Sequence, residues 1–310
     1  MSTTIRTKRR AGPADVAAEP PPPQAAAPSN VLPPEAPTRE VTIAVGEGRL
    51  TFRVAAVAED QAPPTFSLGV RKSGSTMLHK IVGYLARRSA INVVDVPGTF
   101  FRNGFTVADW NKSDLTTVLA PGNVYLGFRS FPTNLTADPT FRDAKKIFMF
   151  RDPRDALVSQ YFSDAYSHSL PSRETSTGAK AAEAFEKKRA EALATDVETY
   201  VVKHARGLDN TLLAFAPMLN DPNCLMLRYE EYVFQKKRLI HKILAHFDWS
   251  CPPPQVEALL RQIDEVPESE DKQRFVRRVI PGDHRNKLGP PAIRRLNNIL
   301  RESMRMYDYY

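Results

Sequence analysis

The stretch TFSLGVRKSGSTML, residues 65–78, decides the fold class of this 310-residue chain. Its first six residues predict a short buried strand, and apolar residues then recur at helical spacing through Leu85. The helix start after such a loop is where backbone N–H groups converge on an anion. We therefore predict a strand–loop–helix anion site, with a hydroxyl residue capping the helix and Lys72 adding a positive charge.

The same order of strand, loop and helix continues downstream. Further predicted strands are residues 123–128, 147–150 and 225–229. Predicted helices are residues 179–193, 197–218, several short ones within 233–265, and 290–306. Strands that alternate with helices predict a parallel sheet covered on both faces. The expected fold is a three-layer α/β domain with a mostly parallel central sheet and a P-loop-like phosphate-binding turn.

The N-terminal part of the chain has a different composition. Residues 1–37 hold nine of the 26 prolines and no aromatic residue. Such a segment buries too little apolar area to offset its ordering entropy, so we expect residues 1–40 to be a disordered tail. Alternating residues around a Gly46-Glu47-Gly48 turn predict a β-hairpin over residues 41–57, at the edge of a domain that covers 41–310.

The net charge of +8 and the pI of about 9.4 favour anionic partners, such as nucleotides, nucleic acid or an acidic membrane surface. No apolar run approaches the ~20 residues that span a bilayer. Cys224 and Cys251 are too few for a disulfide framework, and we expect two thiols in a reducing compartment, the cytoplasm. No metal-ligand spacing is visible, so we expect no metal cofactor.

A second anion site is predicted in RDPRDALVS, residues 151–159. Asp152 is a good N-cap and Pro153 a good first helical residue, which defines the start of a helix. Arg151 then lies at the carboxyl end of a strand, where open α/β sheets bind ligands, and it can fork onto a phosphate. Ser159 lies two turns into the helix, where its hydroxyl can meet the same anion.

Three motifs resemble sulfotransferases that use 3′-phosphoadenosine 5′-phosphosulfate (PAPS). Residues 72–76, KSGST, resemble the 5′-phosphosulfate loop Pro-Lys-Ser-Gly-Thr-Thr-Trp, whereas nucleoside-triphosphatase loops place the lysine after the last glycine. Residues 151–159 match the element that holds the 3′-phosphate in this family. Residues 277–286, RRVIPGDHRN, resemble the loop Arg-Lys-Gly-x-x-Gly-Asp-Trp-Lys-Asn, which closes over the nucleotide. The resemblance covers about residues 65–290.

The resemblance implies transfer of a sulfuryl group from PAPS to a hydroxyl or amine of a carbohydrate, lipid or small-molecule acceptor. Lys72 is the expected catalytic cation, because charge builds on the bridging oxygen as the bond to the 5′-phosphate breaks. Tyr229 is expected near the adenine. The implied PAPS-binding residues are Arg71, Lys72, Ser73, Gly74, Ser75, Thr76, Arg151, Ser159, Tyr229, Arg277, Arg278 and Gly282.

The sequence departs from the family in two places. Ser130 stands where cytosolic sulfotransferases have the His that serves as base, and we predict Asp95 as the base instead, with Asp109 and His168 as alternatives. Met77 stands in place of the family Trp, so one adenine contact is lost or replaced.

Two other function classes compete with this interpretation. A P-loop-like kinase or NTPase is disfavoured by the position of Lys72 and by the lack of an obvious Mg²⁺-binding carboxylate after a strand. A non-catalytic protein that binds nucleic acid or a membrane through its charge would have no nucleotide affinity. We expect a small-molecule, lipid or carbohydrate partner, no nucleic acid and no transmembrane segment, and a homodimer is compatible with the sequence.

Overall fold

The computed structural model describes residues 37–56, 61–167, 176–274 and 276–310. Of the predicted disordered tail, residues 1–36 lie outside these ranges. Residues 38–40 of that predicted tail already belong to strand β1 (Thr38–Val45), so this strand begins three residues before the domain boundary predicted at residue 41. The described residues lie within one unit, Leu32–Tyr310.

The predicted hairpin is confirmed. β1 pairs antiparallel with β2 (Gly48–Ala55), with Val45 opposite Gly48 across the turn. Exposed and buried residues alternate along both strands, which places one face of the hairpin on the main core. The backbone N–H of Ala55 donates to Oδ1 of Asn123 at 2.9 Å, which ties the end of the hairpin to the central sheet.

The central sheet has five strands in the order β4-β5-β3-β6-β7, and every neighbouring pair is parallel. The strands are β3 (Thr65–Gly69), β4 (Asn92–Asp95), β5 (Asn123–Phe128), β6 (Lys145–Phe150) and β7 (Cys224–Arg228). Four of them were predicted. The edge strand β4 was missed because four residues are too few to show a period.

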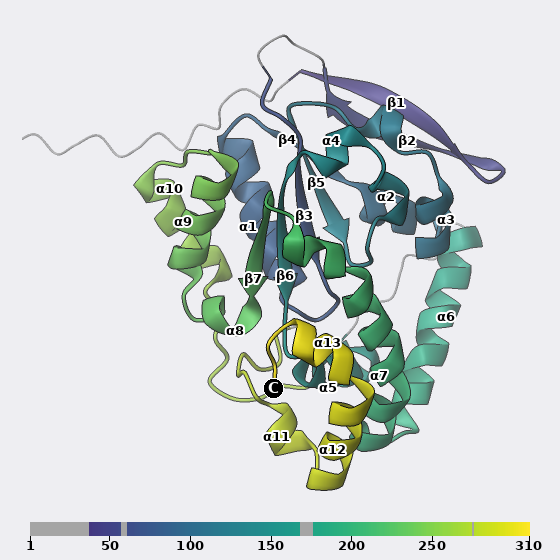
Figure 1. The fold of residues 1–310 in the computed structure, drawn as a ribbon. Helices are drawn as coiled ribbons and strands as arrows, with labels where there is room; N and C mark the ends of the chain where they lie inside the picture. The colour runs from purple at the N-terminus through teal and green to yellow at the C-terminus, as the bar shows by residue number, and fades with distance from the viewer. Residues whose placement is uncertain (1–36, 57–60, 168–175, 275) are drawn as a thin grey trace, which may run out of the picture. The chain divides into compact units, whose positions relative to one another are not determined.

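Helices cover both faces of the sheet, as predicted (Figure 1). One face packs on α1 (Ser75–Arg88), α9 (Lys236–Phe247) and α10 (Pro253–Ile263), through aliphatic residues such as Leu78 and Ile243. The other face carries the aromatic residues Phe66, Phe148 and Phe150. It packs on α5 (Pro153–Phe162), α7 (Val197–Ala214), α12 (Pro290–Ile299) and α13 (Arg301–Met306).

The remaining elements connect these layers. The short α-helices are α2 (Val96–Arg102), α3 (Val107–Lys112), α4 (Pro139–Arg142), α8 (Tyr229–Tyr232) and α11 (His284–Lys287), and α6 (Ser176–Leu193) is longer. The 3-10 helices are η1 (Thr116–Val118), η2 (Thr133–Leu135) and η4 (Ala216–Asn220), and η3 (Ser163–Ser167) is a π-helical turn. Within the described ranges, no helix is long and apolar enough to cross a membrane.

The strand order determines where loops meet. β3 lies between β5 and β6, and α1 leads from β3 toward β4 on one side, whereas β6 and β7 lie on the other side. Such a reversal in strand order opens a crevice at the carboxyl ends of the strands, which is where open α/β sheets bind ligands. The two predicted anion sites follow β3 and β6, which are adjacent, with Gly69 opposite Met149.

Candidate active site

A pocket of about 210 Å³ lies at the carboxyl ends of the strands. Its lining includes eight Lys or Arg residues and one carboxylate, that of Glu265. The basic residues are Arg71, Lys72, Lys80, Arg129, Arg151, Lys236, Arg277 and Arg278. Ser159, Met77 and Tyr229 also line it, together with Gly74, Ser75 and Thr76. The pocket therefore brings together residues from all three predicted motifs and suits a polyanion.

The loop after β3 is held to the sheet by Ser73. The buried Ser73 hydroxyl lies 2.5 Å from the carbonyl oxygen of Val70 and 3.0 Å from that of Met149. Ser73 does not line the pocket. The N-cap of α1 is Gly74 and no side chain caps this helix, so the predicted hydroxyl cap is wrong. The N–H groups of the first turn are therefore left to face a ligand.

Position 74 requires a glycine for two reasons, its backbone conformation and the close contact with Tyr229. Its φ of 86° lies in the left-handed region that glycine adopts readily. A Cβ at this position would come within 2.7 Å of Cδ2 of Tyr229. The Tyr229 ring in turn lies under the Arg151 guanidinium, whose carbon is 4.4 Å from the ring centroid. Gly74 thus lets the two predicted anion sites share one aromatic contact.

Arg151 is 7% exposed and makes only weak contacts with protein acceptors. Its Nη1 lies 3.4 Å from the backbone oxygen of Lys72, and its Nη2 lies 3.6 Å from a carboxylate oxygen of Asp155. Its buried Nε has no hydrogen-bond partner within the described part of the chain. Buried donors are nearly always paired in folded proteins, so an unpaired guanidinium N–H on a pocket wall fits an anionic ligand.

The Asp155 carboxylate makes its short hydrogen bonds with the C-terminal loop and not with Arg151. It accepts hydrogen bonds from the backbone N–H groups of Gly282 (2.6 Å) and His284 (2.9 Å), and lies 2.7 Å from the His284 Nδ1. Burial would raise the pKa of Asp155, but these hydrogen bonds and the charge of Arg151 outweigh it and lower the pKa to about 2. Gly282 therefore holds the loop on α5 and does not itself line the pocket.

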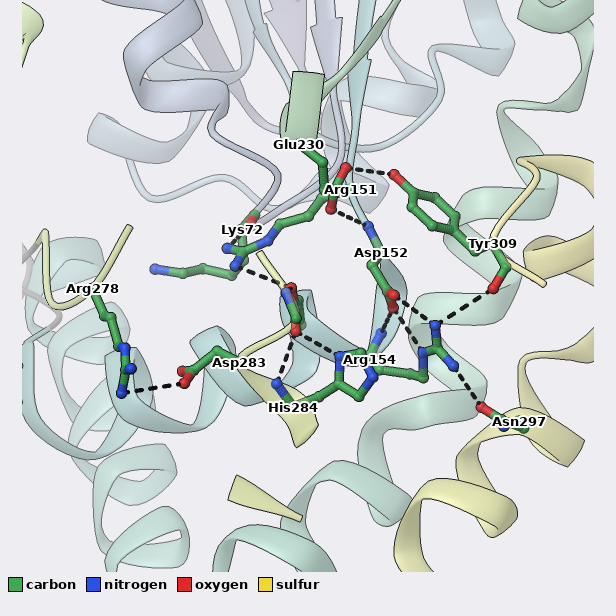
Figure 2. A network of polar contacts seen from close by, with 12 residues as sticks. Lys72, Arg151, Asp152, Arg154, Glu230, Arg278, Asp283, His284, Asn297 and Tyr309 are labelled. Atoms are coloured by element: carbon green, nitrogen blue, oxygen red, sulfur yellow. Dashed lines mark hydrogen bonds and ion pairs between the residues drawn. The ribbon is translucent and has the colours of Figure 1, made fainter. Parts of the chain in front are cut away.

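A network of hydrogen bonds and ion pairs also holds the turn after β6 in place (Figure 2). Asp152 caps α5 through the backbone N–H of Arg154 at 2.9 Å, which confirms the predicted N-cap. The Arg154 side chain forks back onto Asp152 at 3.0 and 2.7 Å. Glu230 accepts from the Asp152 backbone N–H and from the Tyr309 hydroxyl, each at 2.9 Å. The last residues of the chain thus brace the turn that presents Arg151.

Arg277 and Arg278 line the pocket from the C-terminal loop. Arg277 pairs with Glu270 and, at 2.5 Å, with Asp283, and its guanidinium carbon lies 4.2 Å from the ring centroid of Phe162. Arg278 lies 3.5 Å from Glu270. These carboxylates orient the two guanidinium groups at the pocket mouth.

Lys72 lies at the point where the cations of the pocket converge. Its φ of 66° places it in the left-handed region, a conformation that costs a non-glycine residue about 1 kcal/mol. Burial, together with the charges of Arg71, Arg151 and Arg129, lowers the pKa of Lys72 to about 8, and the charge of Asp164 opposes this shift. Lys72 is therefore charged at neutral pH, but loses its proton more readily than an exposed lysine.

The predicted bases lie outside the pocket lining or outside the described residues. Asp95 caps α2 by accepting from the backbone N–H of Gly98 at 2.9 Å, and Arg102 lies 3.2 Å from its other oxygen. Asp109 is partly exposed and accepts hydrogen bonds from the backbone N–H and the hydroxyl of Thr106, the N-cap of α3. His168 lies outside the described residues.

Several pocket residues had no sequence signal. Arg129 follows β5, and its Nε lies 3.4 Å from the hydroxyl of Ser75. His79 lies on α1 outside the pocket lining, and its Nε2 accepts from the Gly127 backbone N–H at 3.4 Å; burial and then Arg129 lower its pKa to about 4. Lys80 and Lys236 belong to helices whose pattern reads as ordinary amphipathic surface. Lys80 and Lys236 reach the pocket lining only through the packing of their helices on the sheet.

Comparisons with known proteins bear on the family and the fold. A sequence model of the sulfotransferase domain matches residues 63–308. The structure is similar to mouse sulfotransferase SULT7A1 complexed with PAP, with a TM-score of 0.53 and 17% identity, over 80% of this chain and 85% of that chain. It is also similar to a sulfotransferase from Alicyclobacillus acidocaldarius, with a TM-score of 0.35 and 18% identity, over 79% and 97% of the two chains. No curated protein sequence matches the chain.

Proposed function

This chain belongs to the sulfotransferase domain family, and we propose that its pocket binds PAPS and directs the sulfuryl group to an acceptor hydroxyl or amine. The observation that supports this proposal most is the buried position of Arg151 on the pocket wall. Its buried guanidinium, whose Nε has no hydrogen-bond partner among the described residues, forms a second anion site beside the loop after β3. A nucleotide with phosphates at both the 5′ and 3′ positions explains why the pocket has two such sites.

The two ends of the nucleotide have different partners in this proposal. The uncapped start of α1, with Ser75 and Thr76, faces the 5′-phosphosulfate, and Lys72 reaches the bridging oxygen. Arg151 and Ser159 hold the 3′-phosphate. Arg277 and Arg278, which also line the pocket, close over it. Tyr229 and Met77 enclose the adenine from α8 and α1. Ser73 and Gly282 contribute by holding their loops in place.

The chemistry that we propose is an in-line displacement at sulfur. The acceptor oxygen or nitrogen forms a bond to sulfur as the bond between sulfur and the bridging oxygen breaks. The leaving 5′-phosphate gains negative charge, which Lys72 stabilises more in the transition state than in the ground state. We propose that Lys72 and its neighbouring arginines supply the positive charge that Mg²⁺ supplies in phosphoryl transfer.

The acceptor must also lose a proton, and we keep Asp95 as the proposed base. It lies at the carboxyl end of β4, on the same sheet edge as the pocket. Its carboxylate packs against Gly127, where a Cβ would lie 2.2 Å from Oδ1. Two residues later in the chain, Arg129 lines the pocket. An acceptor bound beside Arg129 would therefore lie near the Asp95 carboxylate.

The setting of the reaction is also proposed. The acceptor is a carbohydrate, a lipid or a small molecule, and the compartment is the cytoplasm. The free thiols of Cys224 and Cys251 support a reducing compartment. Among the described residues, no group of three or more His, Cys, Asp or Glu side chains forms a metal site.

We expect isothermal calorimetry to show that adenosine 3′,5′-bisphosphate (PAP) binds with micromolar or tighter affinity, about −8 kcal/mol. ATP with Mg²⁺ should bind more weakly, because it has no 3′-phosphate to pair with Arg151. Tighter binding of ATP would favour a kinase or NTPase. No binding of either nucleotide would leave only a non-catalytic role for the basic pocket.

A further inference from the structure

Arg71, the residue before Lys72, forms an ion pair with Asp164. Nη2 of Arg71 lies 2.5 Å from Oδ1 of Asp164. The Asp164 side chain is 2% exposed, and the Arg71 side chain is 31% exposed and lines the pocket. The two residues are 93 positions apart in the sequence, so the contact joins the loop after β3 to the end of α5.

The Asp164 carboxylate is anchored on its far side. Its Oδ2 accepts a hydrogen bond of 2.7 Å from the hydroxyl of Tyr200, a buried residue of α7. The amide of Gln160 lies 3.3 Å from the same hydroxyl. Both carboxylate oxygens of Asp164 are thus engaged, one toward the pocket and one toward the helical layer, which fixes the orientation of the carboxylate.

Asp164 belongs to the π-helical turn η3, which follows α5 directly. Ser163 and Ser167 of this turn line the pocket, so the turn forms part of its wall. A π-helical turn inserts an extra residue into a helix and is frequent at functional sites. Here it places the acidic residue Asp164 directly behind a lining whose charged residues, apart from Glu265, are all basic.

We infer that Asp164 is a positioning residue of the transfer site, anchored by Tyr200, which holds Arg71 beside Lys72 so that both cations face the sulfuryl group. This inference rests on the proposed function. Arg71 then contacts the equatorial oxygens of the group in flight, while Lys72 contacts the bridging oxygen. Without Asp164, the mutual repulsion of Arg71 and Lys72 would drive the two side chains apart.

The same geometry sets the charge of Lys72. The charged groups that face it are Arg71 from its own loop, Asp164 from η3, Arg151 from the loop after β6 and Arg129 from the loop after β5. Asp164 is the acidic member of this set. Because it favours the protonated amine, removing its charge lowers the pKa of Lys72, whereas removing the charge of Arg71 raises it.

The test measures the affinity for PAP by calorimetry between pH 7 and 10, where both phosphates are ionised because their second pKa is about 6. In the wild-type protein, Lys72 is charged below pH 8 and neutral well above it. The affinity should therefore be constant near pH 7 and fall as the pH rises through about 8. Asp164→Asn should move this fall to lower pH by about one unit, and Arg71→Gln should move it to higher pH.

Two further variants separate charge from packing. Asp164→Glu keeps the charge and should keep the wild-type pH for the fall in affinity. Asp143→Asn removes a carboxylate of the same kind from an exposed pair with Arg142, and should change nothing. Opposite shifts of the pH at which PAP affinity falls, for Asp164→Asn and Arg71→Gln, support the inference. If Asp164→Asn does not fold, the shift for Arg71→Gln alone tests it.

If both variants bind PAP and neither changes this pH, the inference is wrong. A wild-type protein that does not bind PAP would overturn the proposed function as well.

Discussion

Replacement of Arg151 by alanine is expected to weaken PAP binding by about 100-fold or more, because charge-assisted hydrogen bonds contribute about 1.5–3 kcal/mol each. The side chain is 7% exposed and stacks on Tyr229, so its geometry is fixed before the ligand arrives. Its Nε has no partner among the described residues, and we expect a phosphate oxygen to supply one in the complex. Arg151→Lys keeps the charge but loses the fork, and should recover only part of the affinity.

The comparison of two ligands makes this prediction specific to the 3′-phosphate. Adenosine 5′-monophosphate lacks that group, so Arg151→Ala should weaken its binding far less than it weakens PAP binding. The matched control is Arg142→Ala, which removes an exposed guanidinium that pairs with Asp143. Equal losses for the two ligands would show that Arg151 supports the pocket without contacting the 3′-phosphate.

Replacement of Lys72 by methionine should slow the conversion of PAPS to PAP by about 10³-fold, the size of effect seen when a charge-stabilising donor is removed from an active site. PAP affinity should fall by no more than about tenfold at neutral pH, because the loop amides, Arg71 and the 3′-phosphate site remain. Methionine has a similar length and keeps the strain of the left-handed backbone unchanged. Single-turnover kinetics with excess enzyme separates the chemical step from product release.

The control for this variant is Lys145→Met. Lys145 lies at the start of β6 and pairs with the exposed Asp248, away from the pocket lining. It should convert PAPS at the wild-type rate. If Lys72→Met also keeps its rate, another cation, such as Arg71 or Arg129, must face the leaving group. A loss confined to PAP affinity would assign Lys72 to binding alone.

The fold was largely predictable because its signals are local. The run over residues 65–78 shows a strand, a glycine turn and an amphipathic helix within 14 residues, and the structure confirms all three elements. Asp152 and Pro153 likewise define a helix start by short-range chemistry. The strand β4 escaped prediction because its four residues, NVVD, form no complete alternation.

The candidate site was predictable where one motif carries its own geometry. Lys72, Arg151, Ser159, Tyr229, Arg277 and Arg278 all line one pocket, as their motifs predict together. The residue pattern of the loop could not show which hydroxyl groups face the pocket and which face the sheet. Ser73 reads as a ligand contact in the sequence, but its hydroxyl is bound to the sheet.

The residues that sequence reasoning missed depend on contacts between distant segments. Asp164 meets Arg71 across 93 positions, through a π-helical turn that no residue pattern announces. Asp155 joins the C-terminal loop across 127 positions, although the motif predicts the loop itself. Such contacts arise from the packing of helices on the sheet, which a single sequence does not encode locally.

The central claim is that this pocket transfers sulfuryl groups from PAPS. The most direct measurement incubates the protein with equal concentrations of ³⁵S-labelled PAPS and γ-³²P-labelled ATP with Mg²⁺, and with pooled acceptors that carry hydroxyl or amine groups. We expect ³⁵S to pass to an acceptor with release of PAP, Lys72→Met to slow this transfer by about 10³-fold, and ³²P not to be transferred. Transfer of ³²P, or ³⁵S transfer that does not depend on Lys72, would contradict this function.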